Sequence, residues 1–195
     1  MIRNDGSGEF AAVLEAAKRG DNEAVGSLYE TYHPLLIRYL RWEQPDVAED
    51  LEGDVWLAVA QSLKRFKGDE RHFKAWLFTI ARHRVVDHRR RMARSRIVFV
   101  EPEVLYGYAG GAGGAGTGDP ADELVANMTA QEAVAQLTAG LAHDQAEVIV
   151  LRVLGGLSVS EVARIIGKRP GTVRVLTHRA LERIARQSPE RKGSR

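Results

Sequence analysis

Apolar residues recur at intervals of three and four along much of this chain, which is the spacing of one buried helix face. No stretch alternates between apolar and polar residues for long enough to indicate a half-buried strand. The pattern therefore predicts an all-α fold. The clearest apolar sets in the first half are Leu28, Tyr32, Leu35, Leu36 and Tyr39, followed by Leu51, Val55, Val59 and Leu63.

Turn and capping residues mark the helix boundaries of the first half. Residues 14–18 belong to a helix that should end at Gly20, and Asp21 is placed to cap the next helix. Pro34 should kink or restart that helix, because proline lacks the backbone N–H that an inner helical position donates. The other expected features are a helix that starts near Asp46, a loop over 65–72 and a helix that begins near Phe73.

A glycine-rich stretch separates two modules, since seven of the twelve residues from 107 to 118 are glycine. Such a segment cannot bury enough apolar area to offset the entropy of ordering it, so we expect a flexible tether that ends near Pro120. The expected organisation is a helical domain over 10–95, a linker over 96–120 and a helical domain over 121–187, the last with helices at 121–139 and 143–154 before a final pair.

The final pair is two helices joined by a tight break. Ser158 precedes an apolar-periodic run and Glu161 follows three residues later, which is the arrangement of a capping box. Gly167 is placed to end the first helix with a positive φ. Pro170 suits the first turn of the second helix, where its missing N–H costs nothing.

The second helix of this pair has two different faces. An apolar stripe of Val173, Leu176, Ala180, Leu181 and Ile184 should face the core. A cationic helix presented after a tight turn has the geometry that enters a DNA major groove, although an ordinary hairpin with a solvated face shares this pattern. The motif alone does not identify the biological purpose of DNA binding. The opposite face carries Thr172, Arg174, Val175, His178 and Arg179.

The net charge of +2 conceals an uneven distribution of charge. Residues 81–96 hold seven arginines and one aspartate, and residues 160–195 hold ten basic and three acidic residues. Between them, residues 97–150 have eight acidic residues and no lysine or arginine. Two basic blocks separated by an acidic one indicate two contacts with a polyanion, although two solvated helix faces and a soluble linker share this pattern.

The basic block of the first domain follows three aromatic residues, Phe73, Trp76 and Phe78. Aromatic rings stack on unpaired bases and arginines hold phosphates, so the segment from 73 to 91 is typical of a single-strand binding surface. Burial in the core remains the simpler role for Trp76 and Phe78.

The sequence carries little sign of catalysis or metal binding. The chain has no cysteine, and its six histidines show no metal-ligand spacing. Asp50 and Asp54 lie four residues apart, but no histidine accompanies them and paired surface carboxylates are usually only solvated. No apolar run reaches the ~18 residues of a membrane span, and no signal peptide is visible. We therefore expect a non-enzymatic cytoplasmic protein without cofactor, metal or membrane insertion.

Taken together, these segments resemble the extracytoplasmic-function (ECF) group of bacterial sigma factors, over nearly the whole chain. "GDNEAVGSLYETYHPLLIRYL" and "AEDLEGDVWLAV" resemble the opening and the polymerase-binding helix of sigma domain 2. "FKAWLFTIARHRVVDHRRR" resembles its promoter-melting and minus-ten segment, and the sequence from 145 to 184 resembles domain 4. Gly53, His83 and the long glycine-rich tether depart from the usual pattern of the family.

The resemblance implies three contact sets on this chain. Docking on the clamp coiled coil of the polymerase β′ subunit would use Asp50, Leu51, Asp54, Val55 and Trp56, although Trp56 could equally be a core residue. Minus-ten DNA, melted and duplex, would contact Lys67, Gly68, Asp69, Arg71, His72, Lys74, Arg82, His83, Arg84, Asp87, His88 and Arg90. The minus-thirty-five element would be read by Arg169, Gly171, Thr172, Arg174, Val175, His178 and Arg179.

The resemblance also implies the partners. These are core RNA polymerase, through the β′ clamp coiled coil and the β flap, double- and single-stranded promoter DNA, and an anti-sigma factor. Two other classes remain open on the residues alone. A stand-alone helix-turn-helix regulator would bind an operator without polymerase, and an enzyme on a helical scaffold would need a convergent set of His, Asp and Glu.

Overall fold

The computed structural model describes residues 6–98 and 130–187, and every regular element in these ranges is a helix. The N-terminal domain consists of α1 (Gly6–Lys18), α2 (Asn22–Glu43), α3 (Ala48–Ser62) and α4 (Glu70–Val98), with short 3₁₀ turns at Pro45–Val47 and Leu63–Arg65. The C-terminal domain consists of α6 (Ala130–Thr138), α7 (His143–Val153), α8 (Val159–Ile166) and α9 (Pro170–Gln187). The all-α prediction is confirmed. The expected linker over 96–120 lies outside the described residues except for 96–98, which belong to α4. Residues 121–129 of the helix expected over 121–139 also lie outside them.

Local capping explains where α2 begins. Asp21 Oδ1 accepts hydrogen bonds from the backbone N–H groups of Glu23 at 2.9 Å and Ala24 at 3.1 Å, as its sequence position predicts. The expected restart at Pro34 is wrong, because α2 continues through it to Glu43. A proline removes one intrahelical hydrogen bond, and the packing of α2 against α1, α3 and α4 outweighs that loss.

The start of α4 also differs from the expected position. The helix begins at Glu70, three residues before Phe73, so the irregular segment between Arg65 and Glu70 is shorter than the predicted loop. Asp69 explains the difference, since its Oδ1 accepts the backbone N–H of His72 at 2.9 Å and thereby caps the first turn. Gly68 precedes it with a φ of 151°, a conformation that favours glycine.

The two domains have different cores that join into one buried cluster. In the N-terminal domain Phe73 is fully buried among aromatic rings, with centroid distances of 4.9 Å to Tyr32 and 5.6 Å to both Phe10 and Phe66. The core of the C-terminal domain is aliphatic and is built from Val148, Val150, Leu151, Leu157, Val162, Ile165, Ile166 and Val173.

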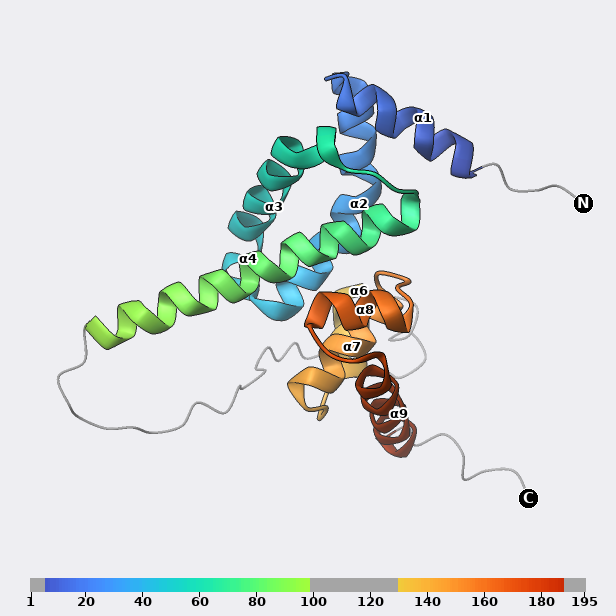
Figure 1. Ribbon diagram of the computed structural model, residues 1–195. Coiled ribbons are helices and arrows are strands. Elements are labelled where there is room, and N and C mark those ends of the chain that lie inside the picture. The colour runs from blue at the N-terminus through green and yellow to red at the C-terminus, as the bar shows by residue number, and fades with distance from the viewer. Residues whose placement is uncertain (1–5, 99–129, 188–195) are drawn as a thin grey trace, which may run out of the picture.

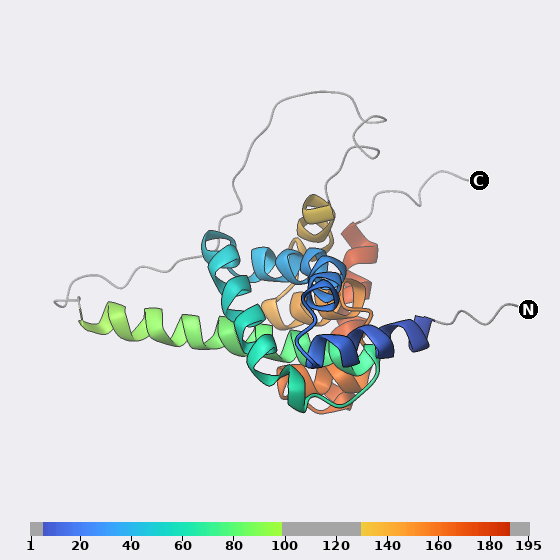
Figure 2. The same cartoon turned by 90° about the horizontal axis from the view of Figure 1, so that it is seen from above.

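The C-terminal domain packs against the N-terminal domain along one side of α4 (Figure 1). Helix α8 contacts α4, and α6 contacts α2. The C-terminal part of α4 projects beyond the rest of the described chain, as both views show (Figures 1 and 2). Two arginine-bearing helices, α4 and α9, thus belong to one packed body in this arrangement.

Candidate nucleic-acid interface

Helices α8 and α9 form the helix-turn-helix that the sequence predicts. The capping box is present: Glu161 Oε2 accepts the Ser158 N–H at 2.6 Å, and Ser158 Oγ accepts the Glu161 N–H at 3.4 Å. Burial alone would raise the pKa of Glu161, but its bonds to Ser158 and the charge of Arg71 outweigh burial and lower it. Gly167 ends α8 with a φ of 68°, and α9 begins at Pro170.

The outer face of α9 is open to solvent. Val173 and Ala180 are fully buried and fix the orientation of the helix against α7 and α8. Leu181 was expected in the same stripe but is 54% exposed. At 3.6 residues per turn it lies about 80° around the helix from Val173, at the edge of the covered side. All seven residues of the predicted minus-thirty-five set are exposed: Arg169, Gly171, Thr172, Arg174, Val175, His178 and Arg179.

Helix α3 places the predicted polymerase-binding residues on two different sides. Leu51 is 2% exposed and Val55 is 0% exposed, so the expectation that they touch a partner needs correction. Their spacing of four residues puts both on the face that packs against the domain core. Asp50 and Asp54 are exposed on the other side of α3.

A second exposed feature of α3 is aromatic and apolar. Trp56 is half-buried, donates its indole N–H to Glu52 at 3.1 Å and lies 5.1 Å from the Tyr29 ring. Leu57 of α3 is 58% exposed, and the neighbouring Tyr29 of α2 is 41% exposed. Sequence reasoning missed both residues, because helical periodicity identifies the buried stripe of a helix and says nothing about which exposed apolar residue has a partner.

The start of α4 carries the predicted loop residues at the surface. Asp69 Oδ1 lies 2.7 Å from His72 Nδ1 as well as accepting the His72 backbone N–H. The backbone bond from His72, followed by this side-chain contact, lowers the pKa of Asp69. Of the predicted minus-ten residues, Lys67, Gly68, Asp69, Arg71, His72, His83, Asp87 and Arg90 are exposed, whereas Lys74, Arg82, Arg84 and His88 are partly buried.

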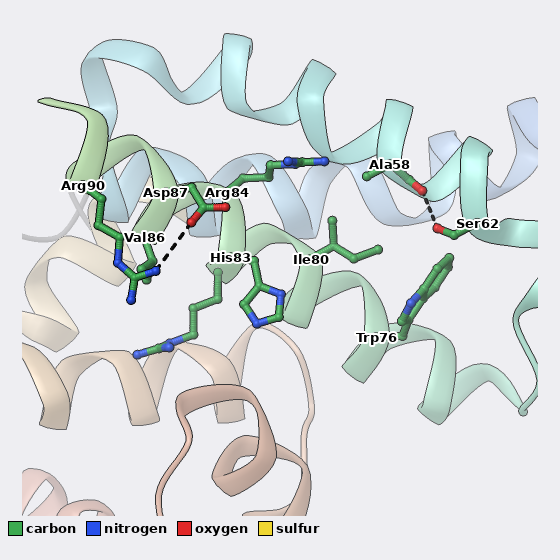
Figure 3. A pocket seen from close by; sticks show the side chains of 10 residues that line it. Ala58, Ser62, Trp76, Ile80, His83, Arg84, Val86, Asp87 and Arg90 are labelled. Carbon is green, nitrogen blue, oxygen red and sulfur yellow. Dashed lines mark hydrogen bonds and ion pairs between the residues drawn. The ribbon is translucent and has the colours of Figure 1, made fainter.

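An open cleft of about 580 Å³ lies between α3 and α4 (Figure 3). Trp76 and Ile80 form one part of its lining, with Ala58 and Ser62 contributed by α3. His83, Arg84, Asp87 and Arg90 form its polar part. The cleft combines an aromatic ring with cationic groups, which suits a base and its phosphate.

Two further observations concern the side chains of this part of α4. Arg84 Nε is buried and has no hydrogen-bond partner among the described residues, so the hydrogen-bonding capacity of this donor is unsatisfied. Trp76 lines the cleft, whereas Phe78 is 1% exposed and packs edge-on against Tyr39 at 5.5 Å. Phe78 therefore serves the core, which was the simpler of its two expected roles.

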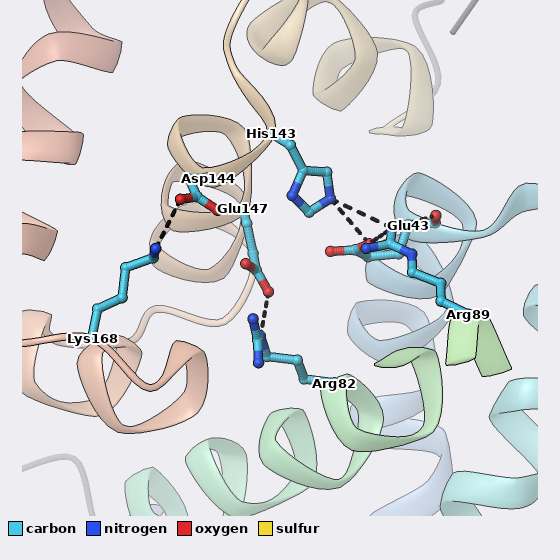
Figure 4. A network of polar contacts seen from close by, with 7 residues as sticks. All are labelled: Glu43, Arg82, Arg89, His143, Asp144, Glu147 and Lys168. Carbon is cyan, nitrogen blue, oxygen red and sulfur yellow. Dashed lines mark hydrogen bonds and ion pairs between the residues drawn. The ribbon is translucent and has the colours of Figure 1, made fainter. Parts of the chain in front are cut away.

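Two arginines of α4 pair with carboxylates at the contact between the two domains (Figure 4). Arg82 Nε donates to Glu147 Oε1 of α7 at 2.7 Å, and Arg89 donates to Glu43 of α2, which also faces His143 Nε2 at 3.3 Å. Burial alone would lower the pKa of Arg82, but the bond to Glu147 outweighs it and raises that pKa. The hydrogen bond to Glu43 raises the pKa of His143.

Glu43, His143 and Glu147 bring ligand atoms within 4.8 Å of one another, so by distance alone they could hold a metal ion. Histidine spacing could not reveal this cluster, because Glu43 comes from a segment far away in the sequence. Arg89 and Arg82 already pair with the two carboxylates and balance their charge. A divalent cation would leave excess positive charge at a largely buried place, so the geometry favours an ion-pair network.

The chain was compared with known proteins. Residues 28–95 match Sigma-70 region 2 and residues 131–184 match Sigma-70 region 4. The ECF RNA polymerase sigma factor ShbA of Streptomyces griseus is 32% identical over 94% of this chain and 97% of its own length. The ECF RNA polymerase sigma factor SigD of Mycobacterium tuberculosis is 34% identical over 89% of this chain and 81% of its own length.

Two solved structures resemble the fold. One is CnrH in complex with the cytosolic domain of CnrY, with a TM-score of 0.57 and 22% identity over 91% of this chain and 95% of that chain. The other is the sigma factor RpoE in complex with the anti-sigma factor NepR from Bartonella quintana, with a TM-score of 0.55 and 25% identity over 82% of this chain and 95% of that chain.

The described helices include none that is long and apolar enough to cross a membrane. The two regional matches fall on the two helical domains that the structure describes, and the relatives match nearly the whole chain at more than 30% identity. The chain therefore belongs to the ECF group of sigma-70 family RNA polymerase sigma factors, which recognise promoters at transcription initiation.

Proposed function

We propose that this sigma factor divides promoter recognition between the exposed face of α9 and the cleft between α3 and α4. The observation that carries the proposal is the exposure of all seven predicted residues, Arg169 in the turn and six residues on α9, after a capped α8. Arg174 would bond a guanine edge and Val175 would contact a thymine methyl in the minus-thirty-five element. The domains would span residues 10–95 and 121–187, and the linker over 96–120 would let both engage one polymerase.

The minus-ten strand would enter the cleft of the N-terminal domain. Trp76 supplies a stacking surface there, and the Arg84 and Arg90 side chains add positive charge. Capturing an unstacked base offsets the few kcal/mol that flipping costs, which is how this surface would favour strand opening. The chain would act without metal, cofactor or catalytic chemistry of its own.

The polymerase-docking surface of α3 would consist of its exposed residues only. Asp50 and Asp54 give it charge, and Leu57 and Trp56 give it apolar area. Leu51 and Val55 would hold the helix in place from the core side. The β′ clamp coiled coil would bind this surface and the β flap would bind the C-terminal domain, within the cytoplasm.

An anti-sigma factor is proposed as the remaining partner. The RpoE structure that resembles this chain is a complex with the anti-sigma factor NepR. An inhibitor of this kind would cover the apolar and acidic docking surface of α3, where Leu57 remains exposed beside Tyr29 of α2.

Selection from a randomised minus-thirty-five region by the holoenzyme of core polymerase and full chain tests the α9 assignment. Arg174→Ala should relax the selected sequence at one or two positions and lose about 1–3 kcal/mol of discrimination there. Arg183→Ala removes the same charge from an exposed place on α9 outside the predicted set, so it should keep the wild-type sequence preference. An unchanged selection with Arg174→Ala would contradict the assignment.

The α3 assignment has its own test, the affinity of the chain for core polymerase. Asp54→Ala should weaken that affinity and leave the selected DNA sequence unchanged. Asp46→Ala, an exposed acidic residue of the preceding 3₁₀ turn, is the matched control and should have no effect on affinity. Equal affinities for the wild type and Asp54→Ala would remove Asp54 from the docking surface.

A further inference from the structure

The contact between the two domains is built from charged side chains as well as apolar ones. Arg82 of α4 bonds Glu147 of α7 at 2.7 Å, and Arg71 near the start of α4 lies 3.5 Å from Glu161 of α8. The side chain of Glu147 is 3% exposed and that of Glu161 is 8% exposed. A buried carboxylate without a partner is strongly destabilising, so Glu147 requires Arg82 of the N-terminal domain. Glu161 also keeps the bond from the Ser158 N–H of its own domain, and Arg71 adds a positive charge beside it.

A third link closes the far end of the same interface. Arg89 and His143 both face Glu43, whose side chain is 1% exposed. The His143 ring also stacks on Trp42 of α2 with centroids 5.5 Å apart and planes 22° apart. The three links together run from the start of α4 to Arg89, so they hold the C-terminal domain along one side of that helix. Figure 4 shows the links at Arg82 and Arg89.

Two of the three arginines in these links belong to the predicted minus-ten surface. A carboxylate oxygen accepts the N–H of a guanidinium in the same way as a phosphate oxygen does. Arg82 bonded to Glu147 has one donor fewer for a DNA phosphate, and Glu161 places a negative charge beside Arg71. The acidic groups of the C-terminal domain therefore occupy places that the backbone of the promoter would need.

We propose that the C-terminal domain is an intramolecular competitor of minus-ten DNA, with Glu147 and Glu161 standing in for phosphates until the domains separate. This regulation rests on the proposed function of the α4 surface. Closure does not cover the outer face of α9, which stays exposed in the same arrangement. The closed chain therefore withholds one DNA surface and leaves the other available.

The absence of cysteine from the chain makes the closed state directly measurable. Cysteines introduced at exposed Ser27 of α2 and Ala185 of α9 can carry a donor and an acceptor dye for energy transfer. Glu147→Gln keeps the size of the side chain but removes the charge that pairs with Arg82. It should lower the transfer efficiency of the full chain and tighten its binding to a mixed-sequence, 20-nucleotide single-stranded DNA by about tenfold, since apparent affinity scales with the fraction of open chain.

The matched control lies one turn earlier on the same helix. Asp144 is exposed and pairs with Lys168 of its own domain at 2.8 Å, so Asp144→Asn removes one negative charge without breaking any of the three links. It should leave both readouts at the wild-type values. The double variant Arg82→Glu and Glu147→Arg exchanges the two charges of the pair. It should restore the transfer efficiency that either substitution alone lowers, and this recovery would also show that the double variant folds.

Three results would overturn this competition. The first is an equal transfer efficiency in the wild-type chain and in Glu147→Gln. The second is a loss of transfer efficiency in Asp144→Asn that equals the loss in Glu147→Gln. The third is a loss of transfer in Glu147→Gln without any gain in DNA affinity. The double variant Glu147→Gln and Arg84→Ala separates failure of the competition from failure of the proposed function. If its DNA affinity is not lower than that of Glu147→Gln alone, the α3–α4 cleft is not the DNA surface.

Discussion

The arginine-bearing helices α4 and α9 present their cations in two different ways. The exposed face of α9 is set by signals within a short segment, from the cap at Ser158 to the proline at Pro170. On α4, by contrast, some arginines pair with residues far away in the sequence. Arg82 pairs with a residue 65 positions later, and Arg89 pairs with one 46 positions earlier. Local chemistry thus fixes a surface that is always available, whereas tertiary pairing creates one that depends on domain arrangement.

The largest expected effect tests the dependence of α4 on distant contacts. Phe73→Ala should lower the free energy of unfolding of the chain by about 3–5 kcal/mol, because a fully buried ring among Phe10, Tyr32 and Phe66 leaves a cavity. Chemical denaturation followed by tryptophan fluorescence measures the loss, since all three tryptophans of the chain precede residue 77. Met92→Ala, on the exposed part of α4, should change stability little, and equal losses in both variants would contradict the account.

A smaller effect tests the local specification of the helix-turn-helix. Ser158→Ala should destabilise the C-terminal domain by about 1 kcal/mol, because it removes the hydroxyl that accepts the Glu161 N–H. Hydrogen exchange of the α8 amides measures this change at the residues that the cap affects. Ser158→Thr should recover most of the lost stability, because threonine also carries the capping hydroxyl. Faster amide exchange in Ser158→Thr than in Ser158→Ala would argue against capping as the cause.

The smallest expected effect is a pH dependence of domain closure. The hydrogen bond to Glu43 raises the pKa of His143 above its ordinary 6.5, and the charge of Glu147 on the same helix adds to this increase. The charge of Arg89 acts in the opposite direction. Asp144 is the next residue on the helix. A raised pKa means that closure binds a proton, so this contribution is complete below about pH 6.5 and disappears as pH rises through the raised value. Because the side chain is half exposed, solvent weakens the effect.

A titration of the dye-labelled chain measures this dependence. Energy transfer should fall as pH increases from about 6 to 9, in the range where a histidine with a raised pKa loses its proton. His143→Gln should give a nearly flat titration over that range. A wild-type titration that rises with pH, or one that His143→Gln does not change, would contradict the assigned role of His143.

The sequence alone predicted the features that depend on neighbouring residues. Asp21 caps α2, Ser158 and Glu161 form the capping box, and Gly167 adopts the positive φ that ends α8. The six predicted positions on α9 are exposed as their helical angles require, and Arg169 is exposed in the turn before it. In each case the deciding interaction lies within a few residues along the chain, where spacing carries the information.

The features that sequence reasoning missed depend on packing or on distant pairs. Pro34 does not restart α2, because three neighbouring helices hold it. Leu51 and Val55 were assigned to a partner but lie in the core, since a motif marks an important helix without marking the side on which each residue lies. The interface between Arg82 and Glu147 could not be predicted, because it requires the relative position of two domains joined by a linker.

Run-off transcription tests the central claim most directly, namely that this chain directs polymerase to promoters through two separate surfaces. The full chain and core RNA polymerase are incubated with a library of promoter fragments, and the templates that yield transcripts are sequenced. The account predicts transcripts from templates that share two upstream motifs, with Arg174→Ala relaxing the distal motif and Arg84→Ala reducing strand opening at the proximal one. Transcription that is absent from every template, or that keeps both motifs and full strand opening in both variants, would contradict it.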